Sequence, residues 1–416
     1  MTSEITQRIE LIRRGEVPNG YQKTKDGIVP VDWHIQRMEQ WVALVERSIT
    51  LEDDKKYHLV TVRRGFGGVD LRGEYLGRDI LVKNYFKVRQ GDFLISKRQI
   101  AHGACGVVPE SLDGAVVSNE YNVFVPNQGT NIKMFNLMMQ LPHYTRLFYL
   151  MSDGVHIEKL LFKTQDWMRR KLAMPSIEEQ QKIATILTTQ NKVIELKEKR
   201  LGEKKRQKKY ILQQLLTGKK RLPGFSVEWE KIKLKNILHE RKAYSPKGVG
   251  FPHVTLSTEG ISPKSERYNR DHLVRDKDKE YKVTYKGDIC YNPANLKFGV
   301  ICENTYGDAI FSPIYVTFEV RKGVCKEYIA NYLMRWDFIN AVRKYEEGTV
   351  YERMAVKPED FLKFEILLPE LKEQIAISEV LSSADREIEL LQQEIEKEKQ
   401  KKKALMQLLL TGIVRV

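Results

Sequence analysis

A duplicated segment constrains the fold of this chain more than any other feature. Residues 174–218 (MPSIEEQQKIATILTTQNKVIELKEKRLGEKKRQKKYILQQLLTG) recur without a gap as residues 368–412 (LPELKEQIAISEVLSSADREIELLQQEIEKEKQKKKALMQLLLTG). Each copy opens with a proline, which suits the first turn of a helix, and ends in Leu-Leu-Thr-Gly, whose glycine is a typical helix stop. The sequence therefore predicts one long helix in each half of a 416-residue chain.

The apolar positions of these segments predict that the two helices pair lengthwise. In the second copy they step by alternating fours and threes, which is the pattern of a coiled coil: Ile377, Leu381, Ala384, Ile388, Leu391 and Ile395. At about 1.5 Å per residue, forty helical positions would make a rod of about 60 Å, which suits a spacer.

The middle of each copy is poorly suited to standing alone. Charged residues replace apolar ones there, at Lys204, Lys205 and Lys208 in one copy and at Glu398 and Lys402 in the other. A single lysine-rich heptad stretch could be a solvated dimerisation helix. Two gap-free copies instead favour pairing with each other, antiparallel.

The segments between the helices repeat as well. Trp33 corresponds to Trp229, Glu46-Arg47 to Glu240-Arg241, Gly91-Asp92 to Gly287-Asp288, Gly106-Val107 to Gly299-Val300, 118–124 to 312–318, Gly154 to Gly348 and Asp166-Trp167 to Asp360-Phe361. The first segment predicts an amphipathic helix over 35–48, strands near 57–64 and 92–96, a helix from Ile132 to Pro142 and a strand before the rod. The N-terminal residues 6–21 resemble the end of a helix followed by a Pro-Asn-Gly turn, which is a fragment of the same repeated unit. The repeat therefore has pseudo-two-fold symmetry when the sequence is treated as a circle.

The loops inside this repeated plan differ between the halves. Between Gly-Asp and Gly-Val the first half has FLISKRQIAHGAC and the second has ICYNPANLKF. Their side chains can address base edges or phosphates, and the candidates for DNA contact are Arg63, Arg64, Lys97, Arg98, Gln99, His102, Asn292, Asn295 and Lys297. Arg98, Gln99, Asn292 and Asn295 are predicted base contacts, and Arg63, Lys97 and Lys297 predicted phosphate contacts.

Composition agrees with a nucleic-acid partner. The formal net charge is +15, and basic pairs occur outside the lysine-rich helices. The four cysteines lack metal-ligand spacing, so we expect reduced core thiols and no metal site. No apolar run is long enough to cross a membrane and the first residues lack the apolar stretch of a secretory signal, so a cytoplasmic location is expected.

Motifs for catalysis are incomplete. A DNA adenine methyltransferase needs an Asp/Asn-Pro-Pro-aromatic loop, but Asn292-Pro293-Ala294-Asn295 lacks the second proline and the aromatic residue. Gly65-Phe66-Gly67-Gly68 does not lie between a clear strand and helix, and Walker-type phosphate loops are absent. We therefore expect no enzymatic activity and no cofactor in this chain.

The ordered duplication resembles the specificity subunits of type I restriction-modification enzymes. Those proteins carry two target-recognition domains, each followed by a helical spacer with P-x-x-E-Q-x-x-I, here at 175–183 and 369–377, and ending in L-L-T-G. The opening turn GYQKTKDGIVPVDW (20–33) is also similar, whereas the second such turn, at 222–229, is shorter.

The circular repeat predicts a mixed α/β fold with an N-terminal helical segment (1–20), globular domains at 21–173 and 219–367, and spacer helices at 174–218 and 368–416. The resemblance implies that the two globular domains are target-recognition domains. It also implies a bipartite asymmetric DNA site and docking of two methyltransferase subunits, with restriction subunits joining through them. S-adenosylmethionine, ATP and Mg²⁺ would be bound by those partners. We expect partner contacts near Glu179, Gln180, Glu373 and Gln374. The alternatives are a coiled-coil scaffold without DNA specificity and a self-contained DNA methyltransferase.

Overall fold

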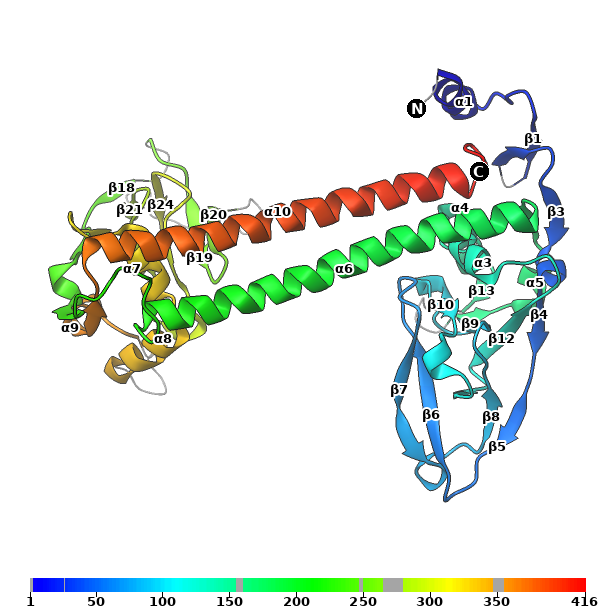
Figure 1. Cartoon of the computed structure of the whole chain (residues 1–416), viewed down its shortest axis with the longest axis horizontal. Helices are drawn as coiled ribbons and strands as arrows, with labels where there is room; N and C mark the ends of the chain where they lie inside the picture. Colours follow the sequence, from blue (N-terminus) through cyan, green and yellow to red (C-terminus); the bar gives the residue numbers. More distant parts are fainter. Residues whose placement is uncertain (1–2, 26, 155–159, 247–249, 265–279, 347–354) are drawn as a thin grey trace. The chain divides into compact units, whose positions relative to one another are not determined.

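The computed structural model describes residues 3–25, 27–154, 160–246, 250–264, 280–346 and 355–416. The chain forms two compact units, each containing strands and helices (Figure 1). Unit 1 comprises Met1–Glu198 with Gln393–Val416, and unit 2 comprises Lys199–Gln392. The fold is therefore mixed α/β, as predicted.

The two long helices are present as predicted from the repeat. They are α6 (Ile177–Leu216) and α10 (Leu371–Leu409). The predicted apolar stripe of α10 is at least partly buried along its whole length, from Ile377 to Ile395. No helix among the described residues is long and apolar enough to span a membrane.

The helix segments inside each unit run antiparallel. In unit 1, the Gln190 amide donates to Glu398 at 2.7 Å and Lys197 pairs with Glu394 at 3.0 Å. In unit 2, Lys204 pairs with Glu387 at 2.9 Å. Later residues of α6 thus meet earlier residues of α10. Opposite charges match Lys204 and Lys208 of α6 and Glu398 of α10, which explains why apolar residues are not needed at these positions.

Unit 1 contains a four-stranded sheet of order β10-β9-β12-β4, a five-stranded sheet of order β5-β8-β11-β6-β7 and smaller pairs. Its other elements are α1 (Ser3–Arg13), β1 (Tyr21–Thr24), β2 (Gly27–Pro30), β3 (His34–Arg37), α2 (Met38–Trp41), β4 (Val42–Val45), β5 (Ser48–Thr50), β6 (Lys56–Val62), β7 (Val69–Leu76), η1 (Gly77–Asp79), β8 (Asn84–Lys87), β9 (Phe93–Ser96), η2 (Ile100–His102), β10 (Cys105–Val107), η3 (Glu110–Leu112), β11 (Val116–Ser118), β12 (Tyr121–Pro126), α3 (Ile132–Met138), α4 (Pro142–Leu150), β13 (Ser152–Asp153), β14 (Leu161–Phe162), α5 (Thr164–Met168) and β15 (Lys171–Met174).

Unit 2 repeats this plan with a four-stranded sheet β17-β25-β22-β23, a three-stranded sheet β18-β21-β24 and a separate hairpin β19-β20. Its elements are β16 (Glu230–Lys233), η5 (Leu234–Asn236), β17 (Leu238–Glu240), β18 (Tyr244–Pro246), β19 (Val254–Ser257), β20 (Gly260–Pro263), β21 (Glu280–Thr284), β22 (Ile289–Tyr291), η8 (Leu296–Phe298), β23 (Ile301–Glu303), β24 (Ala309–Phe311), β25 (Val316–Val320), α7 (Lys326–Leu333), α8 (Trp336–Val342), η9 (Arg343–Tyr345), α9 (Pro358–Lys363) and β26 (Glu365–Leu368).

Each unit has a core in which the sheet packs against both long helices. In unit 1, Phe93, Phe124 and Trp167 cluster with Ile183 of α6 and Leu409 of α10. In unit 2 the corresponding core joins Tyr291, Phe318 and Phe361 to Leu216 of α6 and Ile377 of α10. Trp167 and Phe361 are both fully buried, which confirms that these two positions match. The match of Gly154 with Gly348 cannot be compared, because Gly348 lies outside the described residues.

One predicted helix is wrong. Residues 35–48 form strand β3, the four-residue helix α2 and strand β4 in place of a long amphipathic helix. Val42 and Val45 pair with Pro126 and Val123 of β12. β-Branched residues fit this pleated, partly buried environment, so pairing across the sheet overrides the local helical pattern. The predicted N-terminal helix, the strands near 57–64 and 92–96, the helix beginning at Ile132 and the strand before α6 are confirmed.

Candidate nucleic-acid interface

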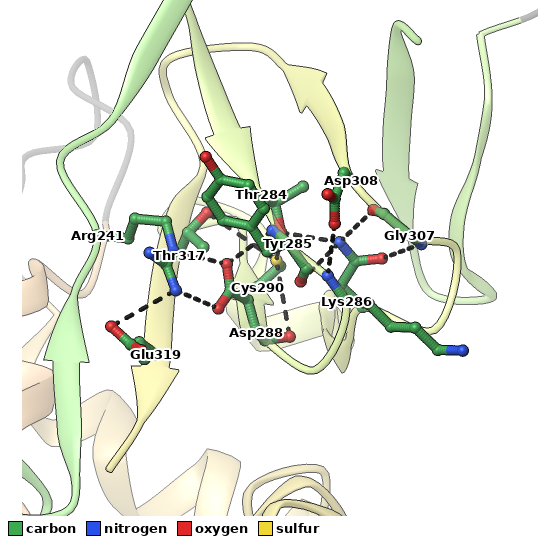
Figure 2. Close-up of polar contacts among 11 residues, drawn as sticks. Arg241, Thr284, Tyr285, Lys286, Asp288, Cys290, Gly307, Asp308, Thr317 and Glu319 are labelled. Atoms are coloured by element: carbon green, nitrogen blue, oxygen red, sulfur yellow. Dashed lines mark hydrogen bonds and ion pairs between the residues drawn. The ribbon is translucent and has the colours of Figure 1, made fainter. Parts of the chain in front are cut away.

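Each unit has the same partly buried ion pair at the end of its β9–β10 or β22–β23 hairpin that lies opposite the variable loop. The Arg47 guanidinium binds both carboxylate oxygens of Asp92, at 2.6 and 3.1 Å. In unit 2, Arg241 binds Asp288 in the same bidentate manner, at 2.9 and 3.0 Å, and also lies near Glu319 (Figure 2). The hydrogen bond to Asp288 raises the pKa of Arg241. Both aspartates also accept a backbone N–H from the residue three positions earlier in the chain, so each closes the turn that precedes strand β9 or β22.

The loops themselves share one backbone structure. We name residues 96–104 loop A and residues 292–300 loop B. In loop A, Ser96 N–H donates to Ala104 O and Gly103 N–H to Ile100 O; in loop B, Asn292 and Gly299 make the corresponding bonds to Val300 O and Leu296 O. Each loop contains a single turn of 3₁₀ helix, η2 or η8, followed by a glycine with positive φ.

This backbone correspondence corrects one sequence match. Gly299 has φ +81° and corresponds to Gly103, with φ +74°, rather than to Gly106. The strand pairs agree, since Ile95 opposes Cys105 in unit 1 and Tyr291 opposes Ile301 in unit 2. In the sequence, Gly299-Val300 can be matched either with Gly106-Val107 or with Gly103-Ala104. Only the backbone conformation shows that Gly103 is the glycine that ends loop A.

Unit 1 adds a second segment to its loop. The β6–β7 turn, residues 63–68, is joined to loop A because Gly65 N–H donates to His102 O at 2.7 Å and Phe66 N–H to Gly103 O at 2.8 Å. Phe66 has φ +59°, an unusual conformation for a residue other than glycine. The Arg64 Nε donates to Gln99 Oε1 at 2.8 Å. The structure thus brings together two sequence-predicted sites that are far apart along the chain.

The remaining basic candidates of unit 1 differ in how they are paired. Arg63 forms an ion pair with Asp70, and Arg98 pairs with Glu120 at 2.7 Å. Both guanidinium groups are more than half exposed. Lys97 is half-buried, and the Nε2 atom of His102 is buried without a hydrogen-bond partner in the described part of the chain. Arg63, Arg64 and Arg98 are therefore the accessible cations of this surface.

Loop B presents fewer polar groups than its sequence indicates. Asn292 is 6% exposed and its Oδ1 accepts the Ala294 N–H at 3.1 Å, so it supports the loop from within, which contradicts its prediction as a base contact. Asn295 is exposed and occupies the position of Gln99. Lys297 lies over the ring of Phe298, whose side chain is 59% exposed. Sequence reasoning missed Phe298, although it stands where loop A has His102.

The four predicted partner contacts are buried links inside each unit. Glu179 is bound by Arg415 at 2.7 Å through two nitrogens, and Glu373 is bound by Arg221 in the same way. Gln180 accepts from Asn131 N–H, and Gln374 accepts from Cys325 N–H. None of the four is more than 6% exposed. This contradicts the expectation that they contact a partner directly, because a side chain buried and paired at a helix start has no free face.

The sequence did contain a signal for this arrangement. Arg221 and Arg415 each stand three residues after the Thr-Gly that ends a spacer helix. Arg415 also binds Asp32 at 2.8 and 2.9 Å, and this contact lowers the pKa of Asp32. The C-terminal residues therefore close unit 1 in the way that Arg221 closes unit 2, which agrees with the circular repeat.

A large cavity lies in unit 1 between the helices and the globular part. Its volume is about 1000 Å³. Apolar residues of both parts line it, among them Ile12, Trp33, Phe66, Leu141, Met406 and Leu410. Lys402 also reaches the cavity, and burial lowers the pKa of its amino group. An apolar cavity of this size suits a protein side chain or helix.

Comparisons with known proteins cover nearly the whole chain. No protein-family model matches it. The chain is 22% identical to a putative type I restriction enzyme MjaX specificity subunit from Methanocaldococcus jannaschii, over 95% of this chain and 97% of that protein. It is 24% identical to the type I restriction enzyme MjaVIII specificity subunit of the same organism, over 93% of this chain and 94% of the relative.

Solved structures show the same fold. The HsdS subunit of Thermoanaerobacter tengcongensis matches with a TM-score of 0.51 at 15% identity, over 93% of this chain and 98% of that one. The type I S subunit from M. genitalium matches with a TM-score of 0.54 at 11% identity, over 95% and 97%. A chain from a type I restriction-modification system, studied for complex assembly and conformational transition, gives 0.57 at 14% identity, over 93% and 99%. By sequence and by fold, this chain is a homologue of the specificity subunits of type I restriction-modification systems.

Proposed function

We propose that this chain is the DNA specificity subunit of a type I restriction-modification complex and that each unit reads one half of a bipartite, asymmetric DNA site. The observation that carries this proposal is that matching hairpins in the two units present loops with different side chains. Loops A and B share one backbone conformation and stand on matching hairpins, each with an Arg–Asp pair at its other end, while the exposed side chains of the loops differ. A scaffold protein would have no need for this difference.

We further propose that the antiparallel helices hold the two recognition domains at opposite ends of a rod and set the gap between the half-sites. The ion pairs within each unit support this arrangement. Inserting four residues after Leu201 and four after Ile395 would lengthen the rod by about 6 Å while nearly keeping the helical phase. That is about one to two base pairs of B-DNA, so the gap in the methylated motif should grow and the half-sites should stay the same.

The proposed partners are two methyltransferase subunits, with restriction subunits joining through them. The cavity lined by Phe66, Leu141 and Met406 is the docking surface we favour in unit 1, because it is apolar and lies beside the paired helices. In unit 2, Met334 at the end of α7 and Trp336 at the start of α8 are 47% and 56% exposed. Exposed aromatic and methionine side chains are frequent at protein interfaces.

Catalysis, in this proposal, belongs to the partners. They would bind S-adenosylmethionine, ATP and Mg²⁺ in the cytoplasm, and this chain would contribute recognition. Three functions can be separated by incubating the purified chain with DNA and a labelled methyl donor, with and without its methyltransferase subunit. If the chain is a specificity subunit, DNA is labelled only when the partner is present. If it is a self-contained methyltransferase, DNA is labelled without the partner. If it is a scaffold, the partner gives no sequence-dependent labelling of DNA.

Binding of the chain to DNA gives an independent measurement. Each phosphate contact lowers log affinity by about 0.9 per unit of log salt concentration. We expect affinity to fall steeply between low and physiological salt, and to gain sequence selectivity when the methyltransferase subunit is present. Binding that does not change with salt would contradict the proposal.

A further inference from the structure

We propose that Arg64 reads a guanine in the half-site of unit 1 and that Gln99 positions its guanidinium for this contact. The inference rests on the function proposed above. It starts from the side-chain hydrogen bond between Arg64 Nε and Gln99 Oε1, at 2.8 Å. The bond uses the Nε–H and leaves the end of the guanidinium, with one N–H on each terminal nitrogen, available for another contact.

The charge of Arg64 distinguishes it from its neighbours. Arg63 pairs with Asp70 and Arg98 with Glu120, so an acidic group already balances each of them. Arg64 is exposed, and within the described residues its side chain has a neutral amide as its hydrogen-bond partner. A guanidinium that is held in place without being neutralised is suited to an electronegative base edge.

The chemistry of the free edge selects one base. The terminal Nη1 and Nη2 groups both donate hydrogen bonds, and the major-groove edge of guanine presents two acceptors, N7 and O6. Adenine offers N7 as an acceptor but a donor at N6, which meets the second N–H of the arginine unfavourably. The exposed end of Arg64 therefore matches guanine and disfavours adenine.

The backbone explains why this arginine is fixed. Gly65 N–H and Phe66 N–H hold the β6–β7 turn on loop A, and the Phe66 backbone has φ +59°. Strained residues of this kind persist where the surrounding structure holds them, and they concentrate at functional sites. The ring of Phe66 lies on Gly103, where an added Cβ would be 3.0 Å from it. The turn is thereby locked to the loop that carries Gln99.

The described residues of unit 2 contain no matching arginine–amide pair on loop B. The parallel bridge between His253 and Ile310 corresponds to that between Leu59 and Val116, so hairpin β19–β20 stands where unit 1 has β6–β7. Its connecting residues are Thr258 and Glu259, with no arginine. Asn295, at the position of Gln99, makes no side-chain hydrogen bond within the described residues. The guanine contact is therefore specific to the half-site of unit 1.

The first test maps the methylated DNA motif of the full complex with wild-type chain, Arg64→Ala and Arg63→Ala. We expect Arg64→Ala to make one guanine position of one half-site degenerate and to leave the other half-site unchanged. That unchanged half-site also reports that the complex is folded and assembled. Arg63→Ala should keep the motif, because a phosphate contact weakens binding uniformly across sequences. A fully retained motif in Arg64→Ala would overturn the inference, whereas the absence of any motif with wild-type chain would overturn the proposed function itself.

The second test does not depend on a variant that must fold. Each guanine of the motif is replaced in turn by 7-deazaguanine, which lacks the N7 acceptor, and binding of the wild-type complex is measured. One guanine in the half-site of unit 1 should become sensitive, with affinity falling by about tenfold. Gln99→Leu, which removes the acceptor, should weaken discrimination at that same guanine. If no guanine of that half-site is sensitive, Arg64 does not read one.

Discussion

Unit 1 and unit 2 share their supports and differ in what those supports present. Both carry a nine-residue loop on a hairpin that has a bidentate arginine–aspartate pair at its other end, and both end the 3₁₀ turn of the loop with a glycine of positive φ. Unit 1 then adds the β6–β7 turn with Arg64 and Phe66, whereas unit 2 leaves Phe298 and Trp336 exposed. The two units therefore keep one loop backbone while the exposed side chains on it change.

The largest effect should come from removing the shared support. Asp92→Ala and Asp288→Ala each leave a partly buried guanidinium without its carboxylate, which should lower the free energy of unfolding by about 3 kcal/mol. We expect similar losses for both, measured by urea denaturation of the full chain. Asp92→Asn and Asp288→Asn, which keep the shape and one acceptor, are the controls and should cost less. A large loss in one unit with none in the other would break the correspondence.

A second prediction concerns the exposed tryptophan of unit 2. Trp336→Ala should weaken binding of one methyltransferase subunit by about 2 kcal/mol, because exposed aromatic residues that anchor an interface contribute this much. Titration calorimetry with the methyltransferase subunit measures both sites, and the second site should keep its affinity. Ile314→Ala, at another exposed apolar residue of unit 2, is the matched control. Equal weakening by both variants would mean that the effect is not a specific contact.

The smallest expected effect is a difference in stability between alanine variants of the two loop glycines, Gly103 and Gly299. Gly103→Ala and Gly299→Ala both place a side chain at positive φ, which costs about 1–2 kcal/mol. In Gly103→Ala the new Cβ also meets the Phe66 ring at 3.0 Å, whereas in Gly299→Ala the nearest atoms, on Trp336, are 3.6 Å away. Thermal denaturation should therefore show a larger loss of stability for Gly103→Ala. The reverse order would mean that Phe66 does not pack on loop A as described.

The sequence predicted the parts of the fold that repeat. The helices α6 and α10, the ion-pair residues and the buried Trp167 and Phe361 all follow from matched positions, since an internal duplication acts as an alignment. The helix predicted over 35–48 was wrong because pairing with β12 is a long-range effect that local periodicity does not contain.

The candidate site was predicted less well, for a physical reason. Residue type predicted which loops carry candidate DNA contacts, but the exposure of each side chain in the fold decides whether it can reach a partner. Asn292, Glu179 and Glu373 are polar residues that the fold uses internally. Arg64 and Gln99 are 35 positions apart in the chain, so their contact depends on the β6–β7 turn lying on loop A, which no sequence pattern reported.

Exchange of residues 21–173 for the first recognition domain of another specificity subunit tests the central claim most directly. The methylated motif of the complex is then mapped by sequencing that detects methyladenine, with the methyltransferase subunits supplied. The account predicts that one half-site changes while the other half-site and the gap between them stay the same. A change in both half-sites, or an unchanged motif, would contradict the claim that each unit reads its own half of the DNA site.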